Sequence, residues 1–108
     1  MNVDEITVEE LNKRLKNGEN LFILDVREPH EFELVNLKGT LIPLGQLPDR
    51  LDEIELVKNQ EVIVHCRSGV RSADACKIMM AAGFKNPRNL AGGIIRWAKE
   101  IDPTMPVY

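Results

Sequence analysis

Apolar residues along the chain fall into short runs separated by stretches with helical spacing. Leu21–Leu24 is continuously apolar and predicts a strand covered on both faces, and the β-branched run Val62–Val64 predicts another buried strand. Further strands are expected at 5–6, 40–42 and 86–90, where Pro87 indicates the beginning of a strand or a sheet edge. Strands that alternate with helices predict an α/β fold, in which a parallel sheet carries helices on both faces.

The helical stretches carry recognisable start and stop signals. Thr7–Glu10 fits a capping box, and the helix after it would place Val8, Leu11 and Leu15 on one face before Asn17-Gly18 ends it. Four more helices are expected: a short one beginning at Pro29, one from near Pro48 through Leu51 and Ile54, one over 70–82 that stops at Gly83, and one over 94–101 that ends at Asp102-Pro103.

Composition narrows the class of protein. A length of 108 residues predicts one domain, spanning 1–108, and 44% hydrophobic with 29% charged residues is typical of a soluble globule. The net charge of −3 argues against nucleic acid as the main partner. No apolar run approaches the ~20 residues of a membrane span, and the acidic N-terminus is unlike a signal peptide. Two cysteines without an export signal predict free thiols in a reducing cytoplasm.

Familiar cofactor and metal motifs are missing from the sequence. There is no Cys-x-x-Cys pair, no dinucleotide fingerprint and no P-loop. We therefore expect chemistry that needs neither a cofactor nor a metal.

Cys66 is the main candidate for chemistry. The strand at 62–64 delivers it to the carboxyl edge of the sheet, where α/β folds place their ligands. Residues 67–71 then form a tight loop into a helix, so backbone N–H groups and the positive end of a helix dipole surround the sulfur. Lowering a thiol pKa from about 8.5 by about two units needs roughly 2.7 kcal/mol, which two hydrogen bonds to the anion supply.

The loop that follows Cys66 holds further candidate residues. They are Arg67, Ser68, Gly69, Val70 and Arg71, which offer N–H donors, the Ser68 hydroxyl and two cations. Such a loop predicts a reactive cysteine held as an anion. The residues alone leave a second interpretation open, in which Cys66 is a small apolar filler at a strand end.

Four other polar or sulfur-bearing residues have more than one interpretation. Asp25 and Arg27 follow the 21–24 strand and either line the pocket or tie loops together. His65 points to the opposite face from its neighbour Cys66, which favours packing over a general-base role. Cys76 falls on the apolar face of the 70–82 helix and is expected to be a buried structural thiol.

Three motifs in order resemble a single-domain rhodanese over nearly the whole chain. They are Leu24-Asp-Val-Arg-Glu-Pro-His-Glu-Phe32, Cys66-Arg-Ser-Gly-Val-Arg71 and Asn89-Leu-Ala-Gly-Gly-Ile-Ile-Arg-Trp97. The resemblance implies a three-layer α/β/α rhodanese-like fold with a roughly five-stranded parallel sheet. It also implies a sulfurtransferase that carries a sulfane sulfur as a persulfide on Cys66, within a loop formed by residues 67–71. The donor would be thiosulfate or the persulfide of a desulfurase.

One departure from the usual rhodanese pattern points to a subgroup. The segment Val35-Asn-Leu-Lys-Gly-Thr40 and the ending Asp102-Pro-Thr-Met-Pro-Val-Tyr108 are similar to the rhodanese domain fused behind an adenylating domain in sulfur-carrier activating enzymes. This likeness implies a ubiquitin-like sulfur carrier as acceptor and an adenylating enzyme as partner. The chain is then either a stand-alone relative or an excised piece.

Two rival functions remain open at this point. Cysteine phosphatases also follow His-Cys with a loop that ends in arginine, but their loop is Cys-x5-Arg, whereas Cys66 to Arg71 is Cys-x4-Arg. The shorter loop makes a tighter ring, which suits one extra sulfur atom better than a tetrahedral oxyanion. The other rival is a module that keeps the fold and only docks a partner, although such relatives usually lose the cysteine.

Overall fold

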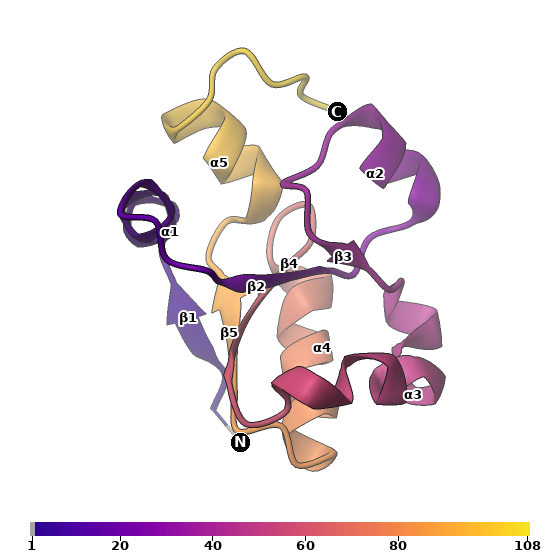
Figure 1. Cartoon of the computed structure of the whole chain (residues 1–108). Coiled ribbons are helices and arrows are strands. Elements are labelled where there is room, and N and C mark those ends of the chain that lie inside the picture. The colour runs from indigo at the N-terminus through magenta and orange to yellow at the C-terminus, as the bar shows by residue number, and fades with distance from the viewer. Residues whose placement is uncertain (1) are drawn as a thin grey trace.

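A parallel sheet lies at the centre of the computed structural model, which describes residues 2–108 (Figure 1). Within those residues it has five strands: β1 (Asp4–Ile6), β2 (Phe22–Asp25), β3 (Thr40–Leu41), β4 (Glu61–His65) and β5 (Asn86–Leu90). Their order across the sheet is β1-β5-β4-β2-β3, and every pairing is parallel. The predicted α/β class and its five-stranded parallel sheet are therefore confirmed.

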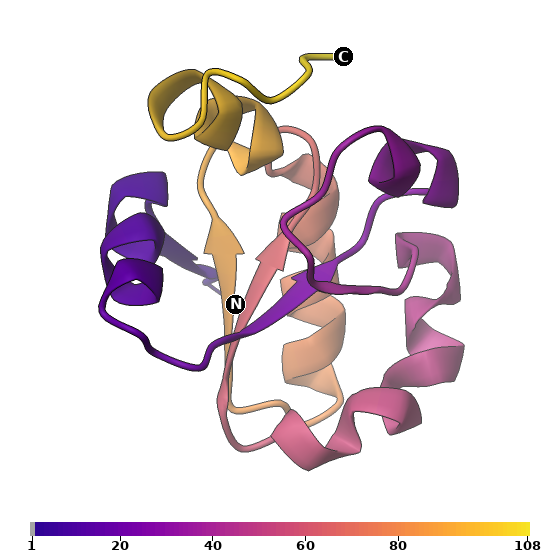
Figure 2. The same ribbon diagram turned by 45° about the horizontal axis from the view of Figure 1, so that its top comes forward.

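Helices cover both faces of this sheet, which gives three layers (Figure 2). The α-helices are α1 (Val8–Lys16), α2 (Pro29–Leu34), α3 (Leu47–Arg50), α4 (Val70–Ala81) and α5 (Gly93–Glu100), and the 3₁₀ helices are η1 (Leu44–Gln46) and η2 (Leu51–Val57). One apolar cluster packs α4 and the 44–57 segment on the sheet, and a second packs α1 and α5 on the other face. Strand β4 joins the two clusters because its side chains alternate: Val62 and Val64 enter the first, and Ile63 enters the second.

Helix boundaries follow the signals in the sequence at two places. Thr7 caps α1 by accepting a hydrogen bond from Glu10 N at 3.1 Å, but the other half of the expected capping box does not form, because the Glu10 carboxylate pairs with Arg88 at 3.1 Å. Helix α4 runs over Val70–Ala81, and Gly83 follows it with a positive φ of 93°. The predicted stop at Gly83 is thus confirmed, because a left-handed residue ends the helical ladder there.

One prediction for the fold is wrong, and a second is decided between its two alternatives. The single helix expected from Pro48 through Ile54 is divided into α3 and η2 at Arg50, which has φ −122° and ψ 8°, and η2 is itself kinked at Ile54, with φ −120° and ψ 23°. This turn in the backbone lets Ile54 join Leu47 in the core against α4. Pro87 lies near the beginning of β5, as expected, but β5 pairs with strands on both sides and is not an edge.

The carboxyl ends of β2, β4 and β5 meet at one edge of the sheet. The 66–69 loop, α2 and the beginning of α5 gather there, and the chain returns to this edge at its C-terminal end (Figure 1). Among the described residues, no helix has both the length and the apolar character needed to cross a membrane.

Helix α5 begins directly against the backbone of Cys66. Ile94 N donates to the Cys66 carbonyl at 3.0 Å, and Ile95 N donates to the Arg67 carbonyl at 3.1 Å. Gly93 permits this approach, because a Cβ atom there would lie 2.3 Å from the Arg67 oxygen and 2.8 Å from the Cys66 oxygen. The first turn of α5 therefore fixes the position of the peptide that carries the candidate cysteine.

The variant Gly93→Ala is expected to lower the free energy of unfolding by about 3 kcal/mol, because backbone atoms that cannot move aside block its Cβ. The matched control is Gly18→Ala, which has a similar positive φ of 82° and nothing within 4 Å of the added Cβ. It should lose only about 1 kcal/mol of left-handed strain. Urea unfolding curves measure both values, and equal losses would contradict the proposed clash.

Candidate active site

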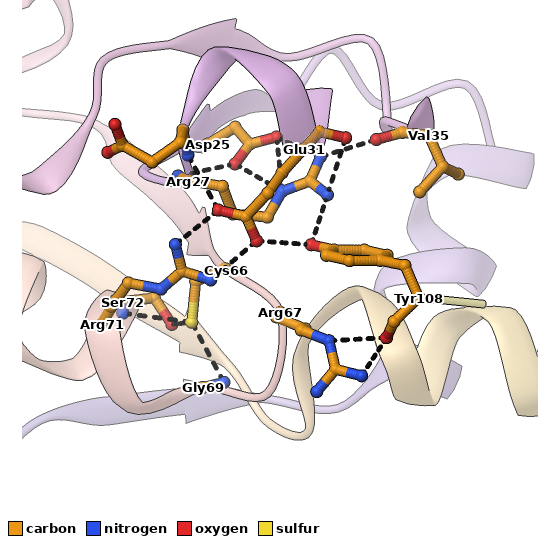
Figure 3. Close-up of polar contacts among 11 residues, drawn as sticks. Asp25, Arg27, Glu31, Val35, Cys66, Arg67, Gly69, Arg71, Ser72 and Tyr108 are labelled. Carbon is orange, nitrogen blue, oxygen red and sulfur yellow. Dashed lines mark hydrogen bonds and ion pairs between the residues drawn. The ribbon is translucent and has the colours of Figure 1, made fainter. Parts of the chain in front are cut away.

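The Cys66 sulfur is surrounded by hydrogen-bond donors from the loop and from the first turn of α4 (Figure 3). Gly69 N lies 3.1 Å from Cys66 Sγ, Ser72 N lies 3.4 Å away, and the Ser72 hydroxyl lies 3.3 Å away. Gly69 is left-handed, with φ 110°, and this conformation aims its N–H at the sulfur. Cys66 as a residue is only 1% exposed, so the donors meet a sulfur that is shielded from water.

This environment lowers the pKa of Cys66. Burial by itself raises the pKa of the thiol, but hydrogen bonds from the Ser72 hydroxyl and from the amides of Ser72, Gly69 and Ser68 stabilise the thiolate and outweigh burial. The other cysteine shows the opposite balance: burial without such donors raises the pKa of Cys76 to about 12. The prediction that Cys76 is a buried structural thiol is confirmed, since it is fully buried in the core.

Asn89 at the end of β5 holds two of the groups around the sulfur. Its Nδ2 donates to the Gly69 carbonyl at 3.0 Å, and its Oδ1 accepts from the Ser72 hydroxyl at 2.5 Å. The Ser72 hydroxyl has one proton, which it can give to Asn89 or to Cys66 but not to both at once. When Cys66 is a thiolate, the hydroxyl can turn towards the sulfur.

Arg71, which was expected at the end of the loop, lies in the first turn of α4 and is bound by Glu31 of α2. Its two terminal nitrogens donate to the two carboxylate oxygens of Glu31 at 2.7 and 2.9 Å. Glu28 N also donates to Glu31 at 3.0 Å, as part of the capping box that begins α2. The hydrogen bonds from Arg71 lower the pKa of Glu31 to about 2 despite its burial. Arg71 is therefore charged and already engaged by an anion.

Asp25 and Arg27 form a buried ion pair behind this arrangement. Both side chains are fully buried, and Arg27 donates to both carboxylate oxygens of Asp25 at 2.7 to 3.2 Å. Arg27 also donates to the Val35 carbonyl at 2.7 Å and to the Tyr108 hydroxyl at 2.8 Å. The pair thus ties the loop after β2 to the chain after α2 and to the C-terminal segment.

His65 pairs with Asp25 across strands β2 and β4, and within residues 2–108 its ring nitrogens have no hydrogen-bond partner. It is fully buried, and its Nε2 is 3.6 Å from Asp25 Oδ2. Burial, together with the charge of Arg27, lowers the pKa of His65 to about 4, so it is neutral at pH 7. The prediction that His65 packs in the interior is confirmed.

Comparison with known proteins identifies the family. A family model described as "Rhodanese-like domain" matches residues 7–100. The chain belongs to the rhodanese-like domain family. It is 39% identical over 98 residues to a sulfurtransferase of Allochromatium vinosum, and the match covers 90% of each chain. Its structure superposes on the crystal structure of a rhodanese-like domain protein from Staphylococcus aureus with a TM-score of 0.81, 29% identity and coverage of 98% and 99%.

A longer relative is similar to the chain over one part of its own length. The chain is 36% identical over 104 residues to the probable adenylyltransferase/sulfurtransferase MoeZ of Mycobacterium tuberculosis. That match covers 95% of the chain and about a quarter (26%) of MoeZ. These matches place the chain in the rhodanese-domain sulfurtransferase family.

Of the groups that the sequence predicted around Cys66, the loop amides lie where expected, but the Ser68 hydroxyl does not. Amides of the 66–72 segment point at Cys66, as the sequence suggested, but the nearby hydroxyl is that of Ser72, while Ser68 is exposed. Val70 is also exposed, at 72%, and Arg67 lies at the surface. No group of three or more His, Cys, Asp or Glu side chains suited to a metal ion occurs within residues 2–108.

Sequence reasoning missed four residues of this rhodanese site: Ser72, Asn89, Glu31 and Tyr108. Asn89 and Glu31 belong to the family motifs, so the motifs themselves were a signal. Tyr108 belongs to the ending Asp102–Tyr108 that resembles the fused rhodanese domains, but this likeness did not reveal its contacts, which are with residues far away in the sequence.

The variant Ser72→Ala is expected to raise the pKa of Cys66 and slow its alkylation at neutral pH by roughly three- to tenfold, the effect of one lost hydroxyl donor. The control Ser68→Ala keeps the amide and removes only an exposed hydroxyl, so the rate should change by less than about twofold. Stopped-flow alkylation against pH gives both values. If Ser68→Ala slowed alkylation more than Ser72→Ala, the hydroxyl that stabilises the thiolate would be that of Ser68, and the prediction would be wrong.

Acid should destabilise the rhodanese domain through His65. Its folded pKa of about 4 is below the unfolded value of 6.5, so the unfolded chain binds the extra proton first. Stability therefore falls as the pH drops from 6.5 towards 4, by about 2 kcal/mol between about pH 7 and about pH 5. Glu31 adds to the loss only below its unfolded value of 4.5. In urea unfolding, His65→Leu should not show the fall in free energy of unfolding that the parent protein shows above pH 5. If His65→Leu kept the pH dependence of the parent protein, His65 would not be its cause.

Proposed function

We propose that Cys66 accepts a sulfane sulfur, holds it as a persulfide and passes it to an acceptor. The observation that carries this proposal is the ring of donors from Gly69 and Ser72 around a buried sulfur of lowered pKa. A thiolate is the nucleophile that such chemistry needs, and the same donors can stabilise a persulfide anion.

The proposed reaction proceeds in two balanced steps. The Cys66 thiolate attacks the outer sulfur of thiosulfate, a new S–S bond forms on Cys66, and the S–S bond of thiosulfate breaks to release sulfite. An acceptor nucleophile such as cyanide then attacks the outer sulfur of the persulfide, takes it as thiocyanate and returns the Cys66 thiolate. No external oxidant or reductant is consumed in either step.

The physiological donor and acceptor are proposed by class. The donor is a small anion such as thiosulfate or a protein persulfide on a desulfurase. The similarity to MoeZ, whose name includes both adenylyltransferase and sulfurtransferase, supports a ubiquitin-like sulfur carrier as acceptor and an adenylating enzyme as partner. Free thiols at Cys66 and Cys76 favour a reducing compartment such as the cytoplasm.

The test is the production of thiocyanate from thiosulfate and cyanide, with mass spectrometry of the protein after thiosulfate alone. We expect turnover and the gain of one sulfur atom on Cys66. Cys66→Ser should lose at least about 100-fold in kcat/KM, because its hydroxyl is not ionised at neutral pH. The matched control is Cys76→Ala, which removes the other thiol from the core and should retain turnover.

Two results would contradict the proposal. One is the absence of both thiocyanate and the added sulfur, which would favour a module that only docks a partner. The other is hydrolysis of an aryl phosphate that disappears in Cys66→Ser, which would indicate a phosphatase with an unusually short loop.

A further inference from the structure

The C-terminal segment of residues 101–108 returns across the sheet edge and ends beside α2 (Figure 1). Ile101 and Met105 pack against the apolar cluster under α1 and α5, which anchors the segment. Its last residue, Tyr108, is half-buried and contacts residues of α2, of the β2 loop and of the Cys66 loop. The end of the chain therefore contacts residues that follow Cys66 and residues that bind its neighbours.

The Tyr108 hydroxyl links the two ion pairs near the sulfur (Figure 3). It accepts a hydrogen bond from Arg27 at 2.8 Å and donates one to Glu31 Oε2 at 2.9 Å. The same carboxylate oxygen accepts from Arg71 at 2.9 Å. Tyr108 thus fixes Glu31 from the side opposite Arg71 and keeps this carboxylate on the loop arginine.

Tyr108 also binds the other loop arginine directly. Arg67 Nε donates to the main-chain oxygen of Tyr108 at 2.7 Å, and Arg67 Nη2 donates to the same oxygen. The Arg67 guanidinium lies 5.1 Å from the centre of the Tyr108 ring, within the range of a cation–π contact. Both cations of the Cys66 loop are therefore engaged by the protein's own groups, Arg71 by Glu31 and Arg67 by Tyr108.

A small anion that binds near Cys66 has to compete with these contacts for the two arginines. To bind Arg67 it must replace the Tyr108 oxygen, and to bind Arg71 it must compete with a carboxylate that Tyr108 holds in place. A donor carried on a protein, by contrast, can gain contacts outside the loop and depends less on the two arginines.

We propose that Tyr108 is a specificity-determining residue that withholds Arg67 and Arg71 from small anionic sulfur donors. This inference rests on the proposed function only in treating the anion as a sulfur donor. The restriction on small anions is argued from the contacts of Tyr108 alone. Tyr108 acts through Glu31 and Arg67, so it is a positioning residue and takes no part in sulfur transfer.

The test compares alkylation of Cys66 by iodoacetate, a small anion, with alkylation by iodoacetamide, its neutral counterpart. All variants carry Cys76→Ala so that only Cys66 reacts. The ratio of the two second-order rate constants cancels any change in the thiolate fraction, because both reagents attack the thiolate. The variants are Tyr108→Ala, Tyr108→Phe and the control Val107→Ala, which alters an exposed neighbour in the same segment.

We expect Tyr108→Ala to raise the iodoacetate-to-iodoacetamide ratio by about threefold, since it removes the ring from Arg67 and the hydroxyl from Glu31 while the main-chain oxygen of residue 108 stays on Arg67. Tyr108→Phe keeps the ring and loses the link to Glu31, so its ratio should rise by about twofold. Val107→Ala should retain the ratio of the parent protein. The gain should shrink at high salt, because ions screen the arginines.

An unchanged or lower ratio in both Tyr108 variants would overturn the proposal. If Tyr108→Ala does not fold, as judged by circular dichroism, Tyr108→Phe decides the question alone. The KM for thiosulfate should fall in Tyr108→Ala with a smaller change in kcat, and a fall in kcat with KM unchanged would also overturn it. Alkylation needs no sulfur transfer, so the ratio remains decisive even if thiocyanate never forms and the proposed function fails.

Discussion

The candidate active site depends on several hydrogen-bond donors that converge on the buried sulfur atom of Cys66. A buried thiolate is costly unless donors replace the water it has lost, so their placement decides whether Cys66 is reactive or inert. Strand β4 brings the residue to the sheet edge, the left-handed Gly69 turns an amide towards it, and the first turn of α4 adds Ser72. Asn89 and the start of α5 hold this loop from the other side. Cys76 lies in the same helix as Ser72 but, within the described part of the chain, has no hydrogen-bond donors around its sulfur. The raised pKa of Cys76 shows what burial alone does to a thiol.

The charges around the sulfur are arranged as pairs rather than as free cations. Asp25 binds Arg27 and Glu31 binds Arg71, and the Tyr108 hydroxyl joins the two pairs. Buried ion pairs contribute little net stability on average, but they define position strongly, since a charge without its partner is costly. This explains why the arginines of the loop cannot simply be counted as a positive surface. Their availability to a ligand depends on what the protein has already bound to them.

Family and geometry contribute different parts of the functional argument. Membership of the rhodanese-like family places the chain among sulfurtransferases, and the donors around Cys66 supply a physical reason for thiolate chemistry. Neither identifies the acceptor, because the chain spans about a quarter of the adenylyltransferase/sulfurtransferase it matches and corresponds to one part of that protein. The contacts of Tyr108 are a property of this chain's own structure and allow a narrower inference about donors.

The sequence by itself determined the parallel α/β architecture and the place of Cys66 at the end of a strand. Those features depend on local periodicity and on turn residues such as Gly83, whose effects extend over a few neighbours. It did not predict the break at Arg50 or the interior place of β5, since both depend on how distant segments share the core. Only the tertiary structure decided which groups surround the sulfur. Glu31 meets Arg71 across 40 residues and Tyr108 meets Glu31 across 77, and no local pattern encodes contacts at such separations.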